Sequence, residues 1–438
     1  MEHQEAAVSP LTEVELMRTL DEKFIRTSIE FEAMWPTATI IVESGPFRGI
    51  DGAIDRERLE AVLMAVGERF VETRMRLMDA PLGLTAPMWV PAGPLDAGYH
   101  VGWFPRVPTA AEEPALFAGA GNVPRLRDRP LWRYCVVERA DGDLAIIGSA
   151  QHALGDALFA LKFVDALLGD GPGAPARLGA APRSRLSGLM VVWGRWLRAR
   201  TGPRDAWHEY WRKPFRKRLS RWGGRLLRPA RNRAIDRRGL RALFAPQPAA
   251  AYWFTELAPA AQLAERLGGG VSDLVTALAL RVVARLEDGP GEASVAIPVS
   301  RRRREAQAVR NSIVMLRVAV SRAAPLADVV AAVHAQVRAF GRSGEGDLSS
   351  AESGAYASYL PYRRSPAAIG GAAVRSVLLW PVPIPGSRFG LFASSYAGGL
   401  SFTALSAPGL DPAAIRAVVE DELADAWSAL AAAEGVAP

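Results

Sequence analysis

The chain has 438 residues, of which 49% are hydrophobic and 23% are charged, so its composition is that of an ordinary globular protein. At roughly 150 residues per domain, this length predicts two or three domains. The single cysteine, Cys135, excludes an internal disulfide framework and a cysteine zinc site. A polar, acidic start and the absence of about 18 uninterrupted apolar residues predict neither a secretory signal nor a membrane span, so a cytoplasmic location is expected.

The first part of the chain alternates strand-like and helix-like segments. The turn formed by Ala140, Asp141 and Gly142 separates two apolar runs and predicts a β-hairpin, which favours mixed sheets over a purely parallel one. Strands are expected at 37–43, 131–138 and 143–150, and helices at 55–70 and 157–168.

The middle of the chain carries the excess positive charge. Residues 183–241 contain 19 Lys and Arg against three Asp and Glu, together with five of the twelve tryptophans. Cations interleaved with indoles are typical of a helix at a membrane or lipid-droplet surface. A solvated face of linker helices explains the charge equally well. Nucleic-acid binding is the least favoured interpretation, because no nucleic-acid-binding motif accompanies the charge.

The alternation of strands and helices resumes after this basic segment. Ser272 is a possible N-cap for the first long helix. Strands are expected at 251–257, 293–299, 313–320 and 399–405, and helices at 272–286, 326–340 and 412–430. We therefore expect an N-terminal half at 1–180, a basic helical linker at 181–245 and a C-terminal half at 246–438.

One segment combines a strand end, a tight turn and a helix start with residues capable of chemistry. It places His152 at the end of the strand and Asp156 at the start of the helix. A neutral imidazole can remove a proton from a hydroxyl group near neutral pH. The aspartate could orient the ring or hold the turn through an ion pair. On spacing alone, a structural histidine remains the commoner interpretation.

Motifs elsewhere in the chain strengthen the catalytic interpretation. They are Leu20-Asp21 through Phe24, Phe70 to Leu77, Trp89-Val90, Tyr99-His100-Val101, Arg129-Pro130-Leu131-Trp132, Val271-Ser272-Asp273, Ile297 to Ser300, Asn311-Ser312, and Tyr396 to Leu400 with Phe402. In order and spacing they resemble the bacterial wax ester synthase/diacylglycerol acyltransferase family, within the CoA-dependent acyltransferase and condensation-domain superfamily. That family's motif is His-His-x-x-x-Asp-Gly. This chain has Gln151 in place of the first histidine, Ala157 in place of the glycine, and Ser272 where the family has asparagine.

The resemblance implies an α/β (α+β) fold of two chloramphenicol-acetyltransferase-like halves with mixed sheets, joined by the basic linker and enclosing a tunnel. It implies acyl transfer from acyl-CoA, a co-substrate, to a long-chain alcohol or diacylglycerol, giving wax ester or triacylglycerol without a cofactor or metal. His152 would be the base, with Asp156 as the second motif residue. The residues expected to line or brace the substrate site are Gln151, Gly155, Ala157, Asp273 and Asn311.

Two other functions stay open. The same scaffold could act on a natural-product acceptor, with a CoA or carrier-protein thioester as donor. The chain could also be a catalytically silent lipid-binding protein. Of the remaining candidates, Arg301 to Arg304 would form a solvated turn or contact CoA phosphates, and His100 is expected to be a satisfied structural histidine. His3, His208 and His334 carry no predicted role.

Overall fold

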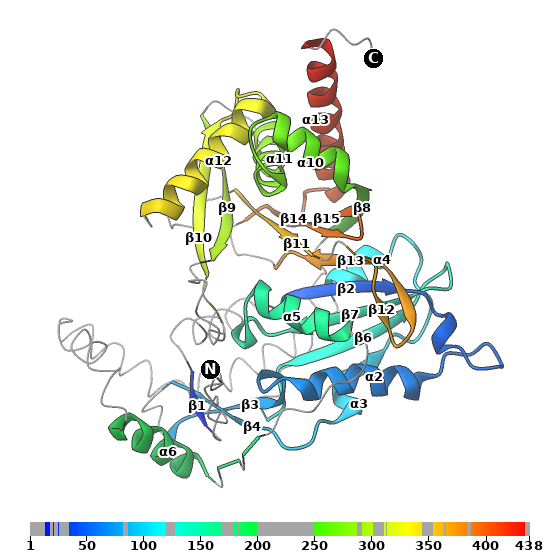
Figure 1. The fold of residues 1–438 in the computed structure, drawn as a ribbon, viewed down its shortest axis with the longest axis vertical. Helices are drawn as coiled ribbons and strands as arrows, with labels where there is room; N and C mark the ends of the chain where they lie inside the picture. The colour runs from blue at the N-terminus through cyan, green and yellow to red at the C-terminus, as the bar shows by residue number, and fades with distance from the viewer. Residues whose placement is uncertain are drawn as a thin grey trace, which may run out of the picture.

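A computed structural model describes most of the chain, and Figure 1 shows its arrangement. The described residues are 14–17, 21, 25, 35–81, 86–119, 128–168, 178–179, 181–182, 184–198, 249–286, 291–300, 311, 313–343, 354–362, 365–382 and 387–433. They form two six-stranded sheets, one in each half, and a small three-stranded sheet. The expected class, an α/β fold of two halves with mixed sheets, is confirmed.

The first sheet carries the predicted hairpin at its centre. Gly142, with a φ of 87°, supplies the left-handed residue that this turn requires. Only β5 and β6 run parallel, and every other neighbouring pair is antiparallel. The strand order is β12 (Ala368–Ile369), β13 (Ala372–Trp380), β2 (Thr37–Val42), β7 (Leu144–Ala150), β6 (Trp132–Glu138) and β5 (Val101–Trp103).

Both faces of the first sheet are buried. Successive side chains of a strand point to opposite faces. Ile40 and Ile146 pack on one face, under α2 (Arg56–Arg69) and α5 (Ala157–Leu167). The neighbouring residues Ile41 and Ile147 pack on the other face, together with Phe117 of α4 (Glu113–Gly119) and Tyr252 of the second half. This second face therefore meets the rest of the molecule instead of solvent.

The second sheet is covered on one face by four helices. Its strands β9, β11 and β14 run parallel to one another, and the outer pairs are antiparallel. The strand order is β10 (Ile313–Ser321), β9 (Glu292–Ser300), β11 (Ala355–Pro361), β14 (Phe389–Tyr396), β15 (Gly399–Ser406) and β8 (Ala249–Glu256). The helices are α10 (Leu257–Arg266), α11 (Val271–Leu286), α12 (Leu326–Ser343) and α13 (Pro412–Ala433).

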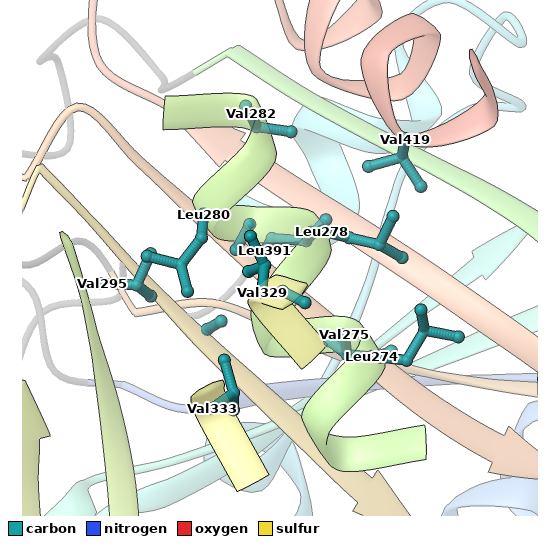
Figure 2. Packing of buried hydrophobic residues seen from close by; sticks show 14 of the residues in the cluster. Leu274, Val275, Leu278, Leu280, Val282, Val295, Val329, Val333, Leu391 and Val419 are labelled. Carbon is teal, nitrogen blue, oxygen red and sulfur yellow. The ribbon is translucent and has the colours of Figure 1, made fainter. Parts of the chain in front are cut away.

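Helix α11 forms the centre of this half. Its residues from Leu274 to Leu280 are buried at every position, because α12 and α13 pack beside it and the sheet lies beneath it. Figure 2 shows Leu278 and Leu280 of α11 close to Leu391 of the sheet and Val329 of α12. The helix begins at Val271, and the carboxylate of Asp273 accepts a hydrogen bond from the Gly270 amide at 2.9 Å. Asp273 therefore satisfies the amide at the start of the helix, and the expectation that Ser272 is the N-cap was wrong.

The small sheet supports the described part of the expected linker. Its order is β1 (Glu15–Leu16), β4 (Met88–Pro91) and β3 (Met75–Met78). Helix α6 (Arg185–Arg198) lies against this sheet, through Val191 and Val192. The rest of the linker lies outside the described residues.

Strand β13 joins the two halves. It comes from the range expected to form the C-terminal half, yet it pairs with β2 of the first sheet from Val374 to Trp380. The hydroxyl groups of Ser394 and Ser401 in the second sheet both donate to the carbonyl oxygen of Val377, at 2.9 Å each. Residues 246–438 therefore contribute to both sheets, because β13 fills an edge that the first half leaves unpaired.

Among the described residues, no single helix has the length and apolar character needed to cross a membrane. Helices α10 and α11 meet those criteria only when taken together, and they are bent by 84° to each other.

A buried carboxylate also links the halves. Glu113 of α4 accepts hydrogen bonds from Arg139, after β6, at 3.1 and 3.2 Å. It accepts another from the hydroxyl of Tyr252 in β8 at 2.8 Å. The Glu113 side chain is 5% exposed and that of Arg139 is 16% exposed, so water screens this pair poorly.

We predict that Glu113→Ala lowers the free energy of unfolding by about 3 kcal/mol, because the largely buried Arg139 guanidinium loses its buried partner and keeps only the exposed carboxylate of Asp141. Urea unfolding followed by circular dichroism measures the change. The matched control is Glu112→Ala, which removes the neighbouring carboxylate from an exposed pair with Arg106. Equal effects of the two variants would contradict the prediction.

Candidate active site

The predicted strand–turn–helix segment is present, and its turn is held by Gln151. Strand β7 ends at Ala150, and His152 begins a short 3₁₀ turn that ends at Leu154. The side-chain oxygen of Gln151 accepts a hydrogen bond from the Ala153 amide, and its backbone carbonyl accepts one from the Leu154 amide at 2.8 Å. Gln151 is 1% exposed. This residue, expected to bind substrate, therefore supports the turn that carries His152.

Asp156 caps the helix that follows the turn. Its carboxylate oxygen Oδ1 accepts a hydrogen bond from the Phe159 amide at 3.4 Å, and its backbone carbonyl accepts one from Ala160 at 3.0 Å. Ala157 is the first residue of α5. Asp156 is 3% exposed, and its negative charge favours the protonated form of His152. It thus contributes both to the local structure and to the electrostatics of the site.

Gly155 lets the chain pass close to α5. A Cβ atom at this position would overlap the Cβ and Cγ atoms of Phe159. The Phe159 ring is itself packed against Phe70 and Phe163, so it has little room to move. Gly155 therefore allows the turn to pack closely against α5, which is a structural role.

His152 contacts Asn311, which lies 159 residues further along the chain. The ring nitrogen Nδ1 is 3.1 Å from the side-chain oxygen of Asn311. The side-chain nitrogen of Asn311 donates to the backbone carbonyl of His152 at 2.7 Å and to the carboxylate of Asp21, also at 2.7 Å. Asn311 lies two positions before the start of β10 in the second sheet, whereas His152 follows β7 of the first. The site therefore spans the two halves.

Burial keeps the imidazole neutral. Removal from water lowers the pKa of His152 below its usual value of 6.5, and this effect outweighs three that raise it. Those three are a hydrogen bond to its own backbone, the hydrogen bond with Asn311 and the charge of Asp156. A neutral imidazole retains one nitrogen lone pair, so the ring can accept a proton at neutral pH.

The structure brings Asn311 to His152 but places Asp273 elsewhere. Asp273 lies in the helical layer of the second sheet, where its carboxylate bonds to the Gly270 amide and to Nδ1 of His334 at 2.8 Å. Asp21 is the residue of this site whose role the sequence analysis missed. It appeared there only within the Leu20-Asp21 motif, which was the one available signal.

The other candidate residues have structural surroundings. His100 is 1% exposed, stacks on Trp132 and contacts the Trp132 carbonyl oxygen through Nδ1 at 2.9 Å. Burial lowers the pKa of His100 to about 4. Cys135 lies in β6, where burial raises the pKa of its thiol and disfavours the thiolate. His3, His208 and Arg301 to Arg304 lie outside the described residues.

No group of three or more potential metal ligands occurs within the part of the chain that the structure describes.

The fold is similar to that of several solved structures. Over 94% of this chain and 98% of the other, the structure aligns with the wax ester synthase/diacylglycerol acyltransferase of Marinobacter aquaeolei VT8, with a TM-score of 0.58 and 17% identity. It also aligns with the first condensation domain of the calcium-dependent antibiotic synthetase, with a TM-score of 0.56 and 14% identity over 94% of this chain and 95% of that one. Polyketide synthase associated protein 5 from Mycobacterium tuberculosis gives a TM-score of 0.54 and 14% identity over 94% and 98% of the two chains. The chain therefore shares its overall fold with these three proteins.

Sequence comparison matches part of the chain to a known family. Residues 36–185 match the model of the wax ester synthase/diacylglycerol acyltransferase catalytic domain. Two proteins of Mycobacterium tuberculosis, from strains CDC 1551 and H37Rv, bear the provisional name diacylglycerol O-acyltransferase and are 36% identical over 102 residues. That alignment spans 23% of this chain and 22% of each relative. Residues 36–185 are therefore similar to the catalytic domain of the wax ester synthase/diacylglycerol acyltransferase family.

We predict that Gly155→Ala destabilises the turn by about 1–3 kcal/mol, because the new methyl group displaces Phe159 from a packed aromatic cluster. Thermal unfolding measures the loss. The control is Gly341→Ala in α12, where nothing lies within 4 Å of an added Cβ and alanine favours the helix. An unchanged unfolding temperature for Gly155→Ala would show that Phe159 gives way without cost.

Proposed function

We propose that this protein transfers an acyl group from acyl-CoA to the hydroxyl group of a long-chain alcohol or diacylglycerol, with His152 as general base. The observation that supports this most strongly is the contact between His152 and Asn311. This contact, between Nδ1 of a neutral imidazole and the side-chain oxygen of Asn311, lies where the two halves meet. The products would be wax esters or triacylglycerols, so the protein would serve lipid biosynthesis.

The reaction proceeds by direct transfer. The acceptor oxygen attacks the thioester carbonyl carbon while its proton passes to Nε2 of His152, and a tetrahedral oxyanion forms. The carbon–sulfur bond then breaks, and the imidazolium returns the proton to the leaving thiolate. The positive end of the α5 dipole, close after the turn, favours the oxyanion. This route uses acyl-CoA as a co-substrate and needs no further cofactor, metal or acyl-enzyme.

Desolvation at His152 favours this role. Because burial lowers the pKa of the ring, the base form persists below pH 6.5, the usual pKa of histidine. The hydrogen bond with Asn311 and the charge of Asp156 oppose this shift and stabilise the imidazolium that forms during the reaction. The site thus combines a base that is neutral at rest with groups that support its transient charge.

A second candidate keeps the chemistry and changes the substrates. Gln151 and Ala157 replace the histidine and glycine at the ends of the family motif, which favours an acceptor other than a fatty alcohol. The likeness to a condensation domain supports a natural-product acceptor with a carrier-protein thioester as donor. A catalytically silent lipid-binding protein is the third candidate, and loss of turnover on removing His152 would exclude it.

We predict that His152→Ala lowers turnover by about 10²–10⁴-fold, because the acceptor hydroxyl loses its proton acceptor. Mass spectrometry after incubation with acyl-CoA and hexadecanol, diacylglycerol or a non-lipid alcohol measures the products. In the wild-type protein, kcat/KM stays level as pH falls from about 8 to 6.5 and drops only below that, as the imidazole becomes protonated. His334→Ala, in the separate pair with Asp273, is the matched control. Undiminished turnover by His152→Ala would exclude the general base.

We further propose that α6 and the basic segment after it contact an anionic membrane or lipid-droplet surface. Leu186, Met190 and Trp193 are 61%, 58% and 47% exposed, and their spacing places them on one face of α6. The opposite face carries Val191 and Val192, which are half-buried and pack against the small sheet. The excess of Lys and Arg in 183–241 complements anionic headgroups, while the exposed face offers side chains that can enter the lipid. This surface would bring the enzyme to water-insoluble substrates.

We predict that replacing Leu186, Met190 and Trp193 together by serine reduces binding to anionic liposomes several-fold, because the apolar contact is lost. Co-sedimentation with and without anionic lipid, at low and high salt, measures the bound fraction. Salt weakens the electrostatic part of wild-type binding. Ile50→Ser with Val107→Ser, at exposed apolar positions away from α6, is the control. Wild-type binding that is absent, or that salt leaves unchanged, would overturn the membrane contact.

A further inference from the structure

Asp21 lies beside the turn that carries His152, although the two residues are 131 positions apart in the sequence. It is 1% exposed, and its carboxylate oxygen Oδ1 accepts a hydrogen bond from the side-chain nitrogen of Asn311 at 2.7 Å. A buried carboxylate is costly unless hydrogen bonds compensate it. We propose that Asp21 is a positioning residue that fixes the tautomer of His152 through the side-chain amide of Asn311. This inference rests on the proposed role of His152 as general base.

The orientation of the Asn311 amide follows from its three contacts. The carboxylate of Asp21 and the carbonyl of His152 can only accept hydrogen bonds, so the nitrogen of the amide must face both of them. The oxygen of the amide is then left to face Nδ1 of His152 at 3.1 Å. An amide oxygen can only accept, so Nδ1 carries the proton. In the neutral ring the lone pair is therefore on Nε2, the nitrogen that takes the proton in the proposed reaction.

Rotation of the amide by half a turn would reverse this assignment. The oxygen would then face the Asp21 carboxylate and the His152 carbonyl, and both hydrogen bonds would be replaced by contacts between acceptors. The amide nitrogen would face Nδ1, which could accept only after its proton had moved to Nε2. The ring would then be unable to take a proton from the substrate at Nε2. In this rotated state the amide oxygen would lie within hydrogen-bonding distance of the negatively charged Asp21 carboxylate. Repulsion between these two acceptors makes the rotated state unfavourable.

The hydrogen bond of the His152 ring to its own backbone and the contact with Asn311 both contribute to this discrimination, and Asp21 increases it. Without Asp21, the amide nitrogen would retain the His152 carbonyl as its acceptor, and the rotated state would lose one hydrogen bond fewer than it does now. Asp21 therefore increases the energy difference between the two orientations of the Asn311 amide. It acts through Asn311 and not by contact with the substrate. The consequence is specific: removing Asp21 should change the protonation pattern of His152 in the resting protein.

The experiment compares Asp21→Leu with the conservative variant Asp21→Asn. Long-range ¹H–¹⁵N spectra of the labelled protein report which ring nitrogen of His152 carries the proton, and loss of the signal in His152→Gln assigns it. The wild-type protein should show a protonated Nδ1. Asp21→Leu should show a mixture of tautomers and a kcat lower by about 10–100-fold, with KM nearly unchanged. Asp21→Asn retains an oxygen that can accept from Asn311, so it should keep the wild-type tautomer and most of kcat.

Glu422→Gln serves as the matched control, since Glu422 is a buried carboxylate bonded to Arg281 and Arg285, on helices α13 and α11. It should leave kcat and the His152 spectrum unchanged. A wild-type spectrum that shows the proton on Nε2 of His152 overturns the inference by itself. The inference can therefore be tested even if Asp21→Leu does not fold. An unchanged tautomer in Asp21→Leu also overturns it, whether kcat falls or not. If His152→Ala retains turnover, the general base is excluded, while the tautomer measurement on the resting protein still tests the role of Asp21.

Discussion

The side-chain amide of Asn311 is the contact on which the rest of the site depends. It has one acceptor and one nitrogen with two donors, and the three groups around it use all of them. Two of these groups belong to His152 in the first half, the third belongs to Asp21 near the N-terminus, and the amide itself belongs to the second half. Hydrogen bonds act only over about 3 Å, so the two halves must be held in close register for the site to exist.

Two features of the fold supply that register. Strand β13 belongs to the first sheet by its pairing, while the chain on either side of it runs in the second half. Separating the halves would break its ladder with β2. Glu113 adds a buried contact with Tyr252 on the same side of the first sheet. The two halves are therefore joined by strand pairing and a buried hydrogen bond. This explains how His152 can have a hydrogen-bond partner in the other half.

The residues around His152 shape the turn that carries the imidazole. Gln151 and Asp156 satisfy backbone amides, and Gly155 allows close packing on Phe159. Glutamine replaces the family's first histidine without leaving the turn unsupported, because its side-chain oxygen reaches the Ala153 amide. Burial of the imidazole lowers its pKa, and the neighbouring acceptors limit that effect. The burial that accompanies this turn thus also sets the proton affinity of the imidazole.

Sequence alone determined the elements with strong periodicity, the hairpin, the two-half mixed fold and the position of His152, because each depends on local patterns of apolar and turn-forming residues. It did not predict β11, β13 or β14, whose strand character depends on pairing with distant segments. It also grouped Asp273 with His152, although Asp273 interacts with a neighbouring helix, and it gave Asp21 no individual role. Only the tertiary structure could decide these points, because hydrogen bonds between residues up to 290 positions apart leave no periodic trace along the chain.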